Sequence, residues 1–192
     1  MRLFVALEIP SAVRDNLAVL IEELRAADAA ATKNKARWVR AENLHVTLKF
    51  IGNVDAGKLD AIRAALGEVS SSGIVELRFR GVGFFPDEKR PRVFWAGIQA
   101  SENLVVLASD IDRVLMKLGI PPEKRPFSAH LTLARFEPPG LPEKLRAAIR
   151  ENASREFGSV AAGEFHLIES KLKPGGAEYT TLETFPFVAA GV

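Results

Sequence analysis

The sequence has no cysteine among its 192 residues, and its only histidines are His45, His130 and His166. The lack of cysteine excludes disulfides, thiolate nucleophiles and zinc or iron–sulfur sites with cysteine ligands. With so few histidines, a metal site would need mostly carboxylate ligands, and no cluster of that kind stands out. We therefore expect neither a metal nor any other cofactor.

Long apolar runs are also lacking. Residues 1–8 are largely apolar, but Glu8 and Pro10 make this segment too short for a secretory leader. No run approaches the length of a membrane span. The composition, 47% hydrophobic and 26% charged, is typical of a globular protein. We expect a soluble, cytoplasmic monomer with no membrane contact.

A large excess of one charge is lacking as well, since 26 Lys and Arg residues against 24 Asp and Glu residues give a formal net charge of only +2. This mild basic excess does not suggest a protein that coats long nucleic acids. It suits a protein that binds a small or terminal anionic group.

Strand-like and helix-like patterns alternate along the chain. The order strand, helix, strand, helix, strand occurs about twice, which predicts an α+β fold. We expect a single domain over residues 1–192 with two pseudo-symmetric lobes, each a mainly antiparallel sheet with flanking helices, around a central cleft. The charged, turn-rich segment 86–92 is the predicted lobe boundary. A helix end and loop are expected over residues 26–35, and turns at 138–140 and 174–176.

The first chemical motif lies in residues 44–50, which alternate as a strand does. Side chains on a strand point to alternate faces, so His45, Thr47 and Lys49 are predicted to share one face. The opposite, core-directed face would carry Leu44, Val46, Leu48 and Phe50.

A second copy of this pattern places His130 and Thr132 on one face of a later strand, almost half the chain away. One His-x-Thr motif is a weak signal, because threonine favours strands. Two copies, one in each predicted lobe and using two of three histidines, form a much stronger signal. The pattern predicts two His-Thr pairs that face each other across a groove.

Such a set suits the cleavage of a phosphodiester. Histidine has a pKa of about 6.5 and can act as base or acid at neutral pH. A base that activates the nucleophile and an acid that protonates the leaving oxygen typically contribute ~10²–10⁴-fold each. Threonine hydroxyls can donate hydrogen bonds to the non-bridging oxygens, where charge develops. This scheme needs no metal.

Several segments, in matching order, resemble the RNA 2′,3′-cyclic phosphodiesterases, the LigT-like "2′-5′ RNA ligase" proteins of the two-histidine phosphoesterase superfamily. The segments are RLFVAL at 2–7, NLHVTLKFIG at 43–52, HLTLAR at 130–135, and ESKL at 169–172 with Tyr179. The resemblance runs from Arg2 to about Phe187. Two mild departures are Ala129, where the family commonly has proline, and Ile51, where it has leucine.

The resemblance implies a bilobal fold and metal-independent opening of a 2′,3′-cyclic phosphate, at an RNA end or in a cyclic nucleotide, to a 2′-phosphate. It implies that His45 is the proton donor to the departing 3′ oxygen and that His130 is the proton acceptor that activates water. Thr47 and Thr132 would hold the phosphate. A weaker joining of ends through a 2′-5′ bond is also implied.

Arg135 and Phe4 are further candidates for substrate binding. The family uses an arginine at Arg135 for phosphate, and a guanidinium suits that geometry. Strict alternation, however, places Arg135 on the face opposite His130, so either the strand ends or bulges before it, or it is a surface arginine. Phe4 either stacks on a base, as aromatics do in RNA recognition, or belongs to the core.

The remaining polar and aromatic residues have plainer interpretations. We expect Lys49 to be a solvated rim lysine, His166 to be structural or exposed, and Trp38 and Trp95 to be packing residues. A basic stretch before the first motif is interpreted as a solvated loop or an RNA-backbone contact; it contains Lys33, Lys35, Arg37 and Arg40.

Two rival functions stay open. The chain could be a catalytically inactive module that binds RNA ends or nucleotides with the same fold. It could also act on another substrate of the superfamily, such as a cyclic ADP-ribose phosphate or a 2′-5′ oligonucleotide.

Overall fold

The computed structural model describes residues 1–28, 36–71, 73–137, 140–174 and 176–187. Most of the predicted loop at 26–35, with Lys33 and Lys35, therefore lies outside the described residues. Parts of both predicted turns, at 138–139 and 175, lie outside them too.

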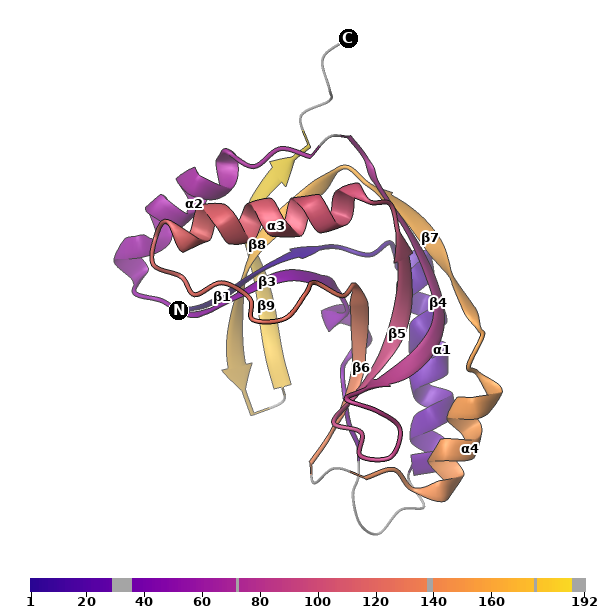
Figure 1. Ribbon diagram of the computed structural model, residues 1–192. Helices are drawn as coiled ribbons and strands as arrows, with labels where there is room; N and C mark the ends of the chain where they lie inside the picture. The colour runs from indigo at the N-terminus through magenta and orange to yellow at the C-terminus, as the bar shows by residue number, and fades with distance from the viewer. Residues whose placement is uncertain (29–35, 72, 138–139, 175, 188–192) are drawn as a thin grey trace.

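The strands form two antiparallel sheets (Figure 1). The four-stranded sheet has the order β3 (Val46–Asn53), β1 (Arg2–Leu7), β8 (Glu164–Lys173) and β9 (Gly176–Pro186). The five-stranded sheet has the order β2 (Ala36–Trp38), β6 (His130–Phe136), β5 (Val93–Ala100), β4 (Val75–Phe85) and β7 (Glu156–Ala162). The predicted α+β class is confirmed, although β7 was not expected.

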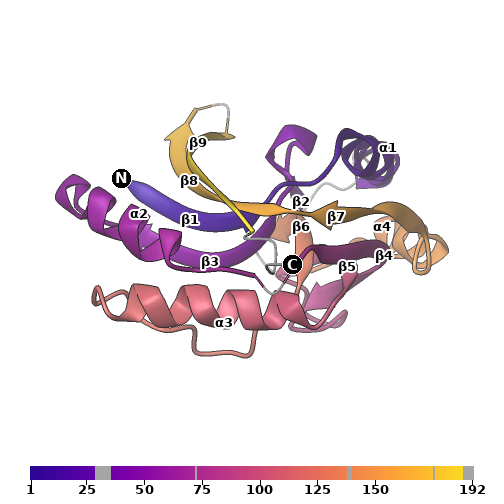
Figure 2. The same ribbon diagram turned by 90° about the horizontal axis from the view of Figure 1, so that it is seen from above.

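Two pairs of helices flank the sheets (Figure 2). Helices α1 (Ser11–Asp28) and α4 (Glu143–Glu151) pack on each other, and α1 also packs on β7 and β2. Helices α2 (Leu59–Gly67) and α3 (Asn103–Met116) pack on each other, with α3 against β3 and α2 against β9. Each sheet therefore has its own helical layer. Short 3-10 turns, η1 (Ala41–Asn43) and η2 (Ala56–Lys58), complete the described elements.

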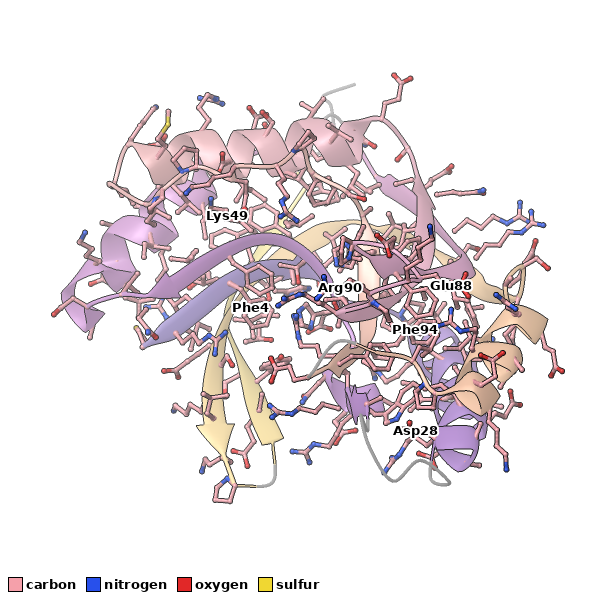
Figure 3. The ribbon with its side chains drawn as sticks, turned by 60° about the horizontal axis from the view of Figure 1, so that its bottom comes forward. Phe4, Asp28, Lys49, Glu88, Arg90 and Phe94 are labelled. Atoms are coloured by element: carbon pink, nitrogen blue, oxygen red, sulfur yellow. The ribbon has the colours of Figure 1, made fainter. Side chains whose placement is uncertain are left out.

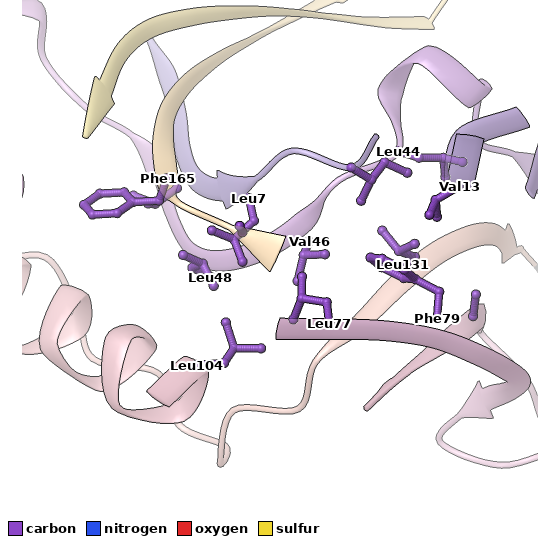
Figure 4. Packing of buried hydrophobic residues seen from close by; sticks show 14 of the residues in the cluster. Leu7, Val13, Leu44, Val46, Leu48, Leu77, Phe79, Leu104, Leu131 and Phe165 are labelled. Atoms are coloured by element: carbon purple, nitrogen blue, oxygen red, sulfur yellow. The ribbon is translucent and has the colours of Figure 1, made fainter. Parts of the chain in front are cut away.

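One hydrophobic core joins the two sheets (Figure 4). Leu7 and Val46 of the four-stranded sheet belong to the same buried cluster as Leu77 and Leu131 of the five-stranded sheet. Burying each such side chain contributes about 1.5–3 kcal/mol, so this shared core holds the two sheets at a fixed angle.

The predicted lobe boundary at 86–92 is wrong. This segment joins β4 to β5, which are neighbours in the five-stranded sheet, and the Arg92 amide donates a 2.8 Å hydrogen bond to the Phe85 carbonyl. A charged, turn-rich composition is as typical of a hairpin loop as of a linker. The two sheets are interleaved along the chain instead, because β1 pairs with β8 from the other end of the sequence.

Within the described ranges, none of the helices has the length and apolar character needed to cross a membrane.

Candidate active site

The first His-x-Thr motif contains a β-bulge that the sequence does not reveal. Val5 pairs with Lys49 and Ala6 with Thr47, so Leu48 is an extra residue in β3. A bulge shifts the alternation by one residue. Phe50, expected in the core, is therefore 56% exposed, and Lys49, expected at the rim, is 2% exposed.

Lys49 instead anchors the chain segment that leads to the second motif (Figure 3). Its ammonium donates a 2.7 Å hydrogen bond to the Pro121 carbonyl and pairs with the carboxylates of Asp112, on α3, and Glu123. A buried lysine requires such partners, because an unpaired buried charge is costly. The prediction of a solvated rim lysine is wrong for this reason.

The second motif has a bulge at the same place. Phe94 pairs with Ala134 and Trp95 with Thr132, so Leu133 is the extra residue in β6. The shift turns Arg135 to the same face as His130 and Thr132, which is one of the possibilities that the sequence left open. Arg135 thus occupies the position in the second motif that Phe50 occupies in the first.

Both His-Thr pairs line one cavity of about 220 Å³. His45 and Thr47 reach it from the four-stranded sheet, and His130 and Thr132 from the five-stranded sheet. The other lining residues are Arg2, Val39, Asn43, Phe50, Arg135, Ser170, Leu172, Ala177 and Tyr179. Two imidazoles that can take or give a proton therefore line one cavity, each beside a threonine hydroxyl.

The two imidazole rings are held in the same way. The Nδ1 atom of His45 lies 2.8 Å from the Asn43 carbonyl oxygen, and Nδ1 of His130 lies 2.8 Å from the Ser128 carbonyl oxygen. A carbonyl only accepts hydrogen bonds, so Nδ1 carries a hydrogen in each ring. The Nε2 atom of each histidine is left free to take or give a proton.

Aromatic rings surround His45 more closely than His130. Phe4 and Tyr179 lie 4.6 and 5.3 Å from the His45 ring centre, whereas Phe85 lies 5.0 Å from that of His130. Burial lowers the pKa of His45, and the hydrogen bond to the Asn43 carbonyl only partly opposes this effect. When no substrate is bound, burial therefore favours the neutral form of the His45 imidazole.

Phe4 is a buried residue that packs against the His45 ring. It is 3% exposed, packs with Ala6 and Ile168, and is absent from the cavity lining. Stacking on a base is therefore not available to it, and its ring contacts His45 and Tyr179 instead. Phe50 and Tyr179 are the exposed aromatic side chains that line the cavity. Because of the bulge, strand alternation does not predict Phe50 as a cavity residue.

The third histidine is structural, as expected. His166 is 5% exposed, its Nδ1 lies 3.1 Å from the Thr184 hydroxyl oxygen, and its Nε2 lies 3.7 Å from a Glu164 carboxylate oxygen. It does not line the cavity. Among the described residues, no group of three His, Asp or Glu side chains could hold a metal ion.

The two tryptophans pack, as expected. The Trp38 indole donates a 3.3 Å hydrogen bond to Asp28 and lies edge-on to Phe94. Trp95 lies against Gly83, where any larger side chain would collide with its ring.

The described part of the basic stretch lies outside the cavity lining. Arg37 pairs with Glu137, and Arg40 pairs with Glu42. Both arginines are largely exposed, which fits the solvated interpretation.

Comparisons with known proteins identify relatives over nearly the whole chain. Over 185 residues the chain is 35% identical to proteins named RNA 2′,3′-cyclic phosphodiesterase from Methanothermobacter thermautotrophicus and Archaeoglobus fulgidus. The alignments cover 96% of this chain and 97% and 99% of those proteins.

Solved structures give the same result. A crystal structure of a Thermus thermophilus protein has a TM-score of 0.79 and 30% identity and covers 100% of both chains. Escherichia coli LigT complexed with 3′-AMP has a TM-score of 0.73 and 29% identity over 97% of both chains. The family model described as LigT like Phosphoesterase matches residues 7–95 and 97–179. The chain belongs to the LigT-like phosphoesterase family.

Proposed function

We propose that this protein hydrolyses the 2′,3′-cyclic phosphodiester at RNA ends to a 2′-phosphomonoester. The observation that carries the proposal is the meeting of two His-Thr pairs, one from each sheet, in a single cavity. The names of the relatives, RNA 2′,3′-cyclic phosphodiesterase, agree with it.

In this reaction His130 Nε2 takes a proton from a water molecule, whose oxygen attacks phosphorus. The bond between phosphorus and the 3′ oxygen breaks, and His45 Nε2 gives its proton to that oxygen. The 2′ bond is kept, so the product is a 2′-phosphate. Thr47 and Thr132 donate hydrogen bonds to the non-bridging oxygens, and the Arg135 guanidinium offsets their charge.

The environment of His45 fits this role once substrate is present. Burial lowers its pKa in the empty cavity, so much of it is neutral at neutral pH. A bound phosphate brings a negative charge next to the ring and favours the protonated form. Substrate would therefore help to load the proton that the leaving oxygen needs.

The test is incubation with a 2′,3′-cyclic nucleotide in the presence of a chelator, with the product identified. We expect a 2′-phosphate, and a loss of about 10²–10⁴-fold in His45→Ala and in His130→Ala. His166→Gln is the matched control, because His166 lies outside the cavity. Normal turnover by either His→Ala variant would contradict the two-histidine mechanism. No turnover by the wild type would favour a binding module.

The same groups could join RNA ends through a 2′-5′ bond if the 5′-hydroxyl of a second RNA end replaced water: His130 would take its proton, the bond between phosphorus and the 3′ oxygen would break, and His45 would protonate that oxygen. We also propose a cytoplasmic monomer that needs no metal or other cofactor. The lack of cysteine fits a reducing compartment.

A further inference from the structure

The charged side chains among the described residues of the cavity lining are all basic. Arg2, on β1, and Arg135, on β6, both line it, and no Asp or Glu is among its described lining residues. Within the described part of the chain, no carboxylate lies within 4.0 Å of either guanidinium. By contrast, Arg37 and Arg78, which lie outside the lining, pair with acidic residues. Two cations without counter-ions on one concave surface attract anions.

Arg2 belongs to neither His-x-Thr motif. It is the first residue of β1, and alternation places it on the same face as Phe4, beneath the cavity. Leu3 pairs with Glu169, so Ser170 comes next to Arg2, and Ser170 in turn pairs with Tyr179. Arg2, Ser170 and Tyr179 thus form a polar row across three strands.

The positive charges of Arg2 and Arg135 both act on the Tyr179 hydroxyl. Burial raises the pKa of Tyr179, and the charges of Arg2 and Arg135 partly offset this rise. The phenol therefore keeps its proton at neutral pH and can donate a hydrogen bond to an anion. Two guanidiniums and one hydroxyl therefore line the same cavity as the histidine pair.

A single cyclic phosphate does not use all of these groups. It carries one negative charge, and it must lie between His45 and His130, where both threonines reach it. A nucleobase carries no full charge, so it does not account for a second unpaired arginine. On an RNA end, a neighbouring anion is the phosphate on the 5′ oxygen of the same terminal nucleotide.

We propose that Arg2, with the Tyr179 hydroxyl, binds the 5′-phosphate of the nucleotide whose 2′,3′-cyclic phosphate reacts. This inference rests on the proposed function and adds a substrate preference to it. The enzyme would favour a cyclic end that continues into an RNA chain, or carries a 5′-monophosphate, over a cyclic nucleotide with a free 5′-hydroxyl. Arg2 would be the residue that reads this difference.

The activity test compares two substrates that differ by one group: adenosine 2′,3′-cyclic phosphate with a 5′-hydroxyl or with a 5′-phosphate. We expect wild-type kcat/KM to be about tenfold or more higher for the 5′-phosphate, as for one charge-assisted hydrogen-bonded pair. Arg2→Gln should remove most of this ratio, and Arg2→Lys should keep part of it. Arg135→Gln should lower both rates while the ratio persists.

Arg37→Gln is the matched control, since Arg37 is an exposed arginine outside the cavity lining, and it should keep the wild-type ratio. A wild-type ratio near one would overturn the inference. So would an Arg2→Gln variant that loses both rates equally. Either outcome would leave the hydrolysis of the 5′-hydroxyl substrate, and so the proposed function, intact.

Binding gives a readout that does not need turnover. Calorimetry would compare adenosine 2′-phosphate with adenosine 2′,5′-bisphosphate. We expect the bisphosphate to bind about tenfold or more tightly to the wild type, with a steeper salt dependence, and Arg2→Gln to lose this gain. Equal affinities for the two ligands would refute the role of Arg2 even in a fully active enzyme.

Discussion

His45 and His130 start from the same local geometry. Each Nδ1 bonds to the carbonyl two residues earlier, and each strand bulges one residue after the threonine. The residues that follow the bulges differ: Phe50 reaches the cavity from one motif and Arg135 from the other. The repeated backbone therefore places the two His-Thr pairs in equivalent positions, and the differing side chains around them make the cavity asymmetric.

The largest expected effect separates the two histidines by their roles. An analogue with sulfur in place of the 3′ oxygen has a thiolate leaving group, whose pKa of about 8.5 makes protonation unnecessary. On this analogue we expect His45→Ala to regain most of its ~10²–10⁴-fold loss. His130→Ala should stay impaired, because water still needs a base. Equal recovery by both variants, measured as kcat, would contradict the assignment.

The second prediction compares Lys49 with Ala134, which holds the equivalent position after the other bulge. Removing one partner of a buried ion pair costs about 3–5 kcal/mol. Asp112 is partly exposed, so we expect Lys49→Met to lower the free energy of unfolding by about 2 kcal/mol, measured by urea denaturation. Ala134 has no ion pair to lose but is fully buried, so the matched control is Lys58→Met, at an exposed lysine. An unchanged midpoint for Lys49→Met would show that the anchor is dispensable.

The third prediction concerns Phe50 and Arg135, the residues that make the cavity asymmetric. Arg135→Gln should weaken inhibition by inorganic phosphate about tenfold, since it removes a charge-assisted contact. Phe50→Ala should leave phosphate inhibition unchanged and weaken nucleotide binding about tenfold through lost stacking. Inhibition constants for phosphate and for a 2′-nucleotide measure both. The opposite pattern would reverse the two assignments.

The smallest expected effect is a pH shift at His45. Burial lowers its pKa, so in the free enzyme His45 loses its proton below the ordinary value of about 6.5. A proton donor is lost as pH rises through its pKa. The descending limb of kcat/KM, which reports the free enzyme, should therefore lie at lower pH than that of kcat, where substrate has raised the pKa. Coincident limbs would argue against this coupling.

The sequence predicts the positions of the histidines and threonines, because two residues of alternation suffice to place them on one face. Beyond the bulge that follows each threonine, alternation no longer predicts which face of the strand a side chain occupies. Leu48 is buried like Leu44 and Val46, and Leu133 is buried like Leu131, so the apolar pattern marks neither as a bulge. The error exchanged Phe50 with Lys49 and left Arg135 undecided.

The predicted boundary failed for a different reason. Strand pairing between β1 and β8 depends on contacts between distant parts of the chain, which local composition does not encode. Strand β7 was missed because Gly158 and a run of small residues weaken its strand pattern.

The pairing of β1 with β8 also sets the order of events during synthesis. The sheet under His45 cannot close until residues 164–173 have left the ribosome, well after β1 and β3 have been made. Such long-range pairing slows folding, and it leaves the edge of β1 open in the nascent chain. The ability to process RNA ends would therefore arise only after this segment has emerged, in the step that completes the floor of the cavity.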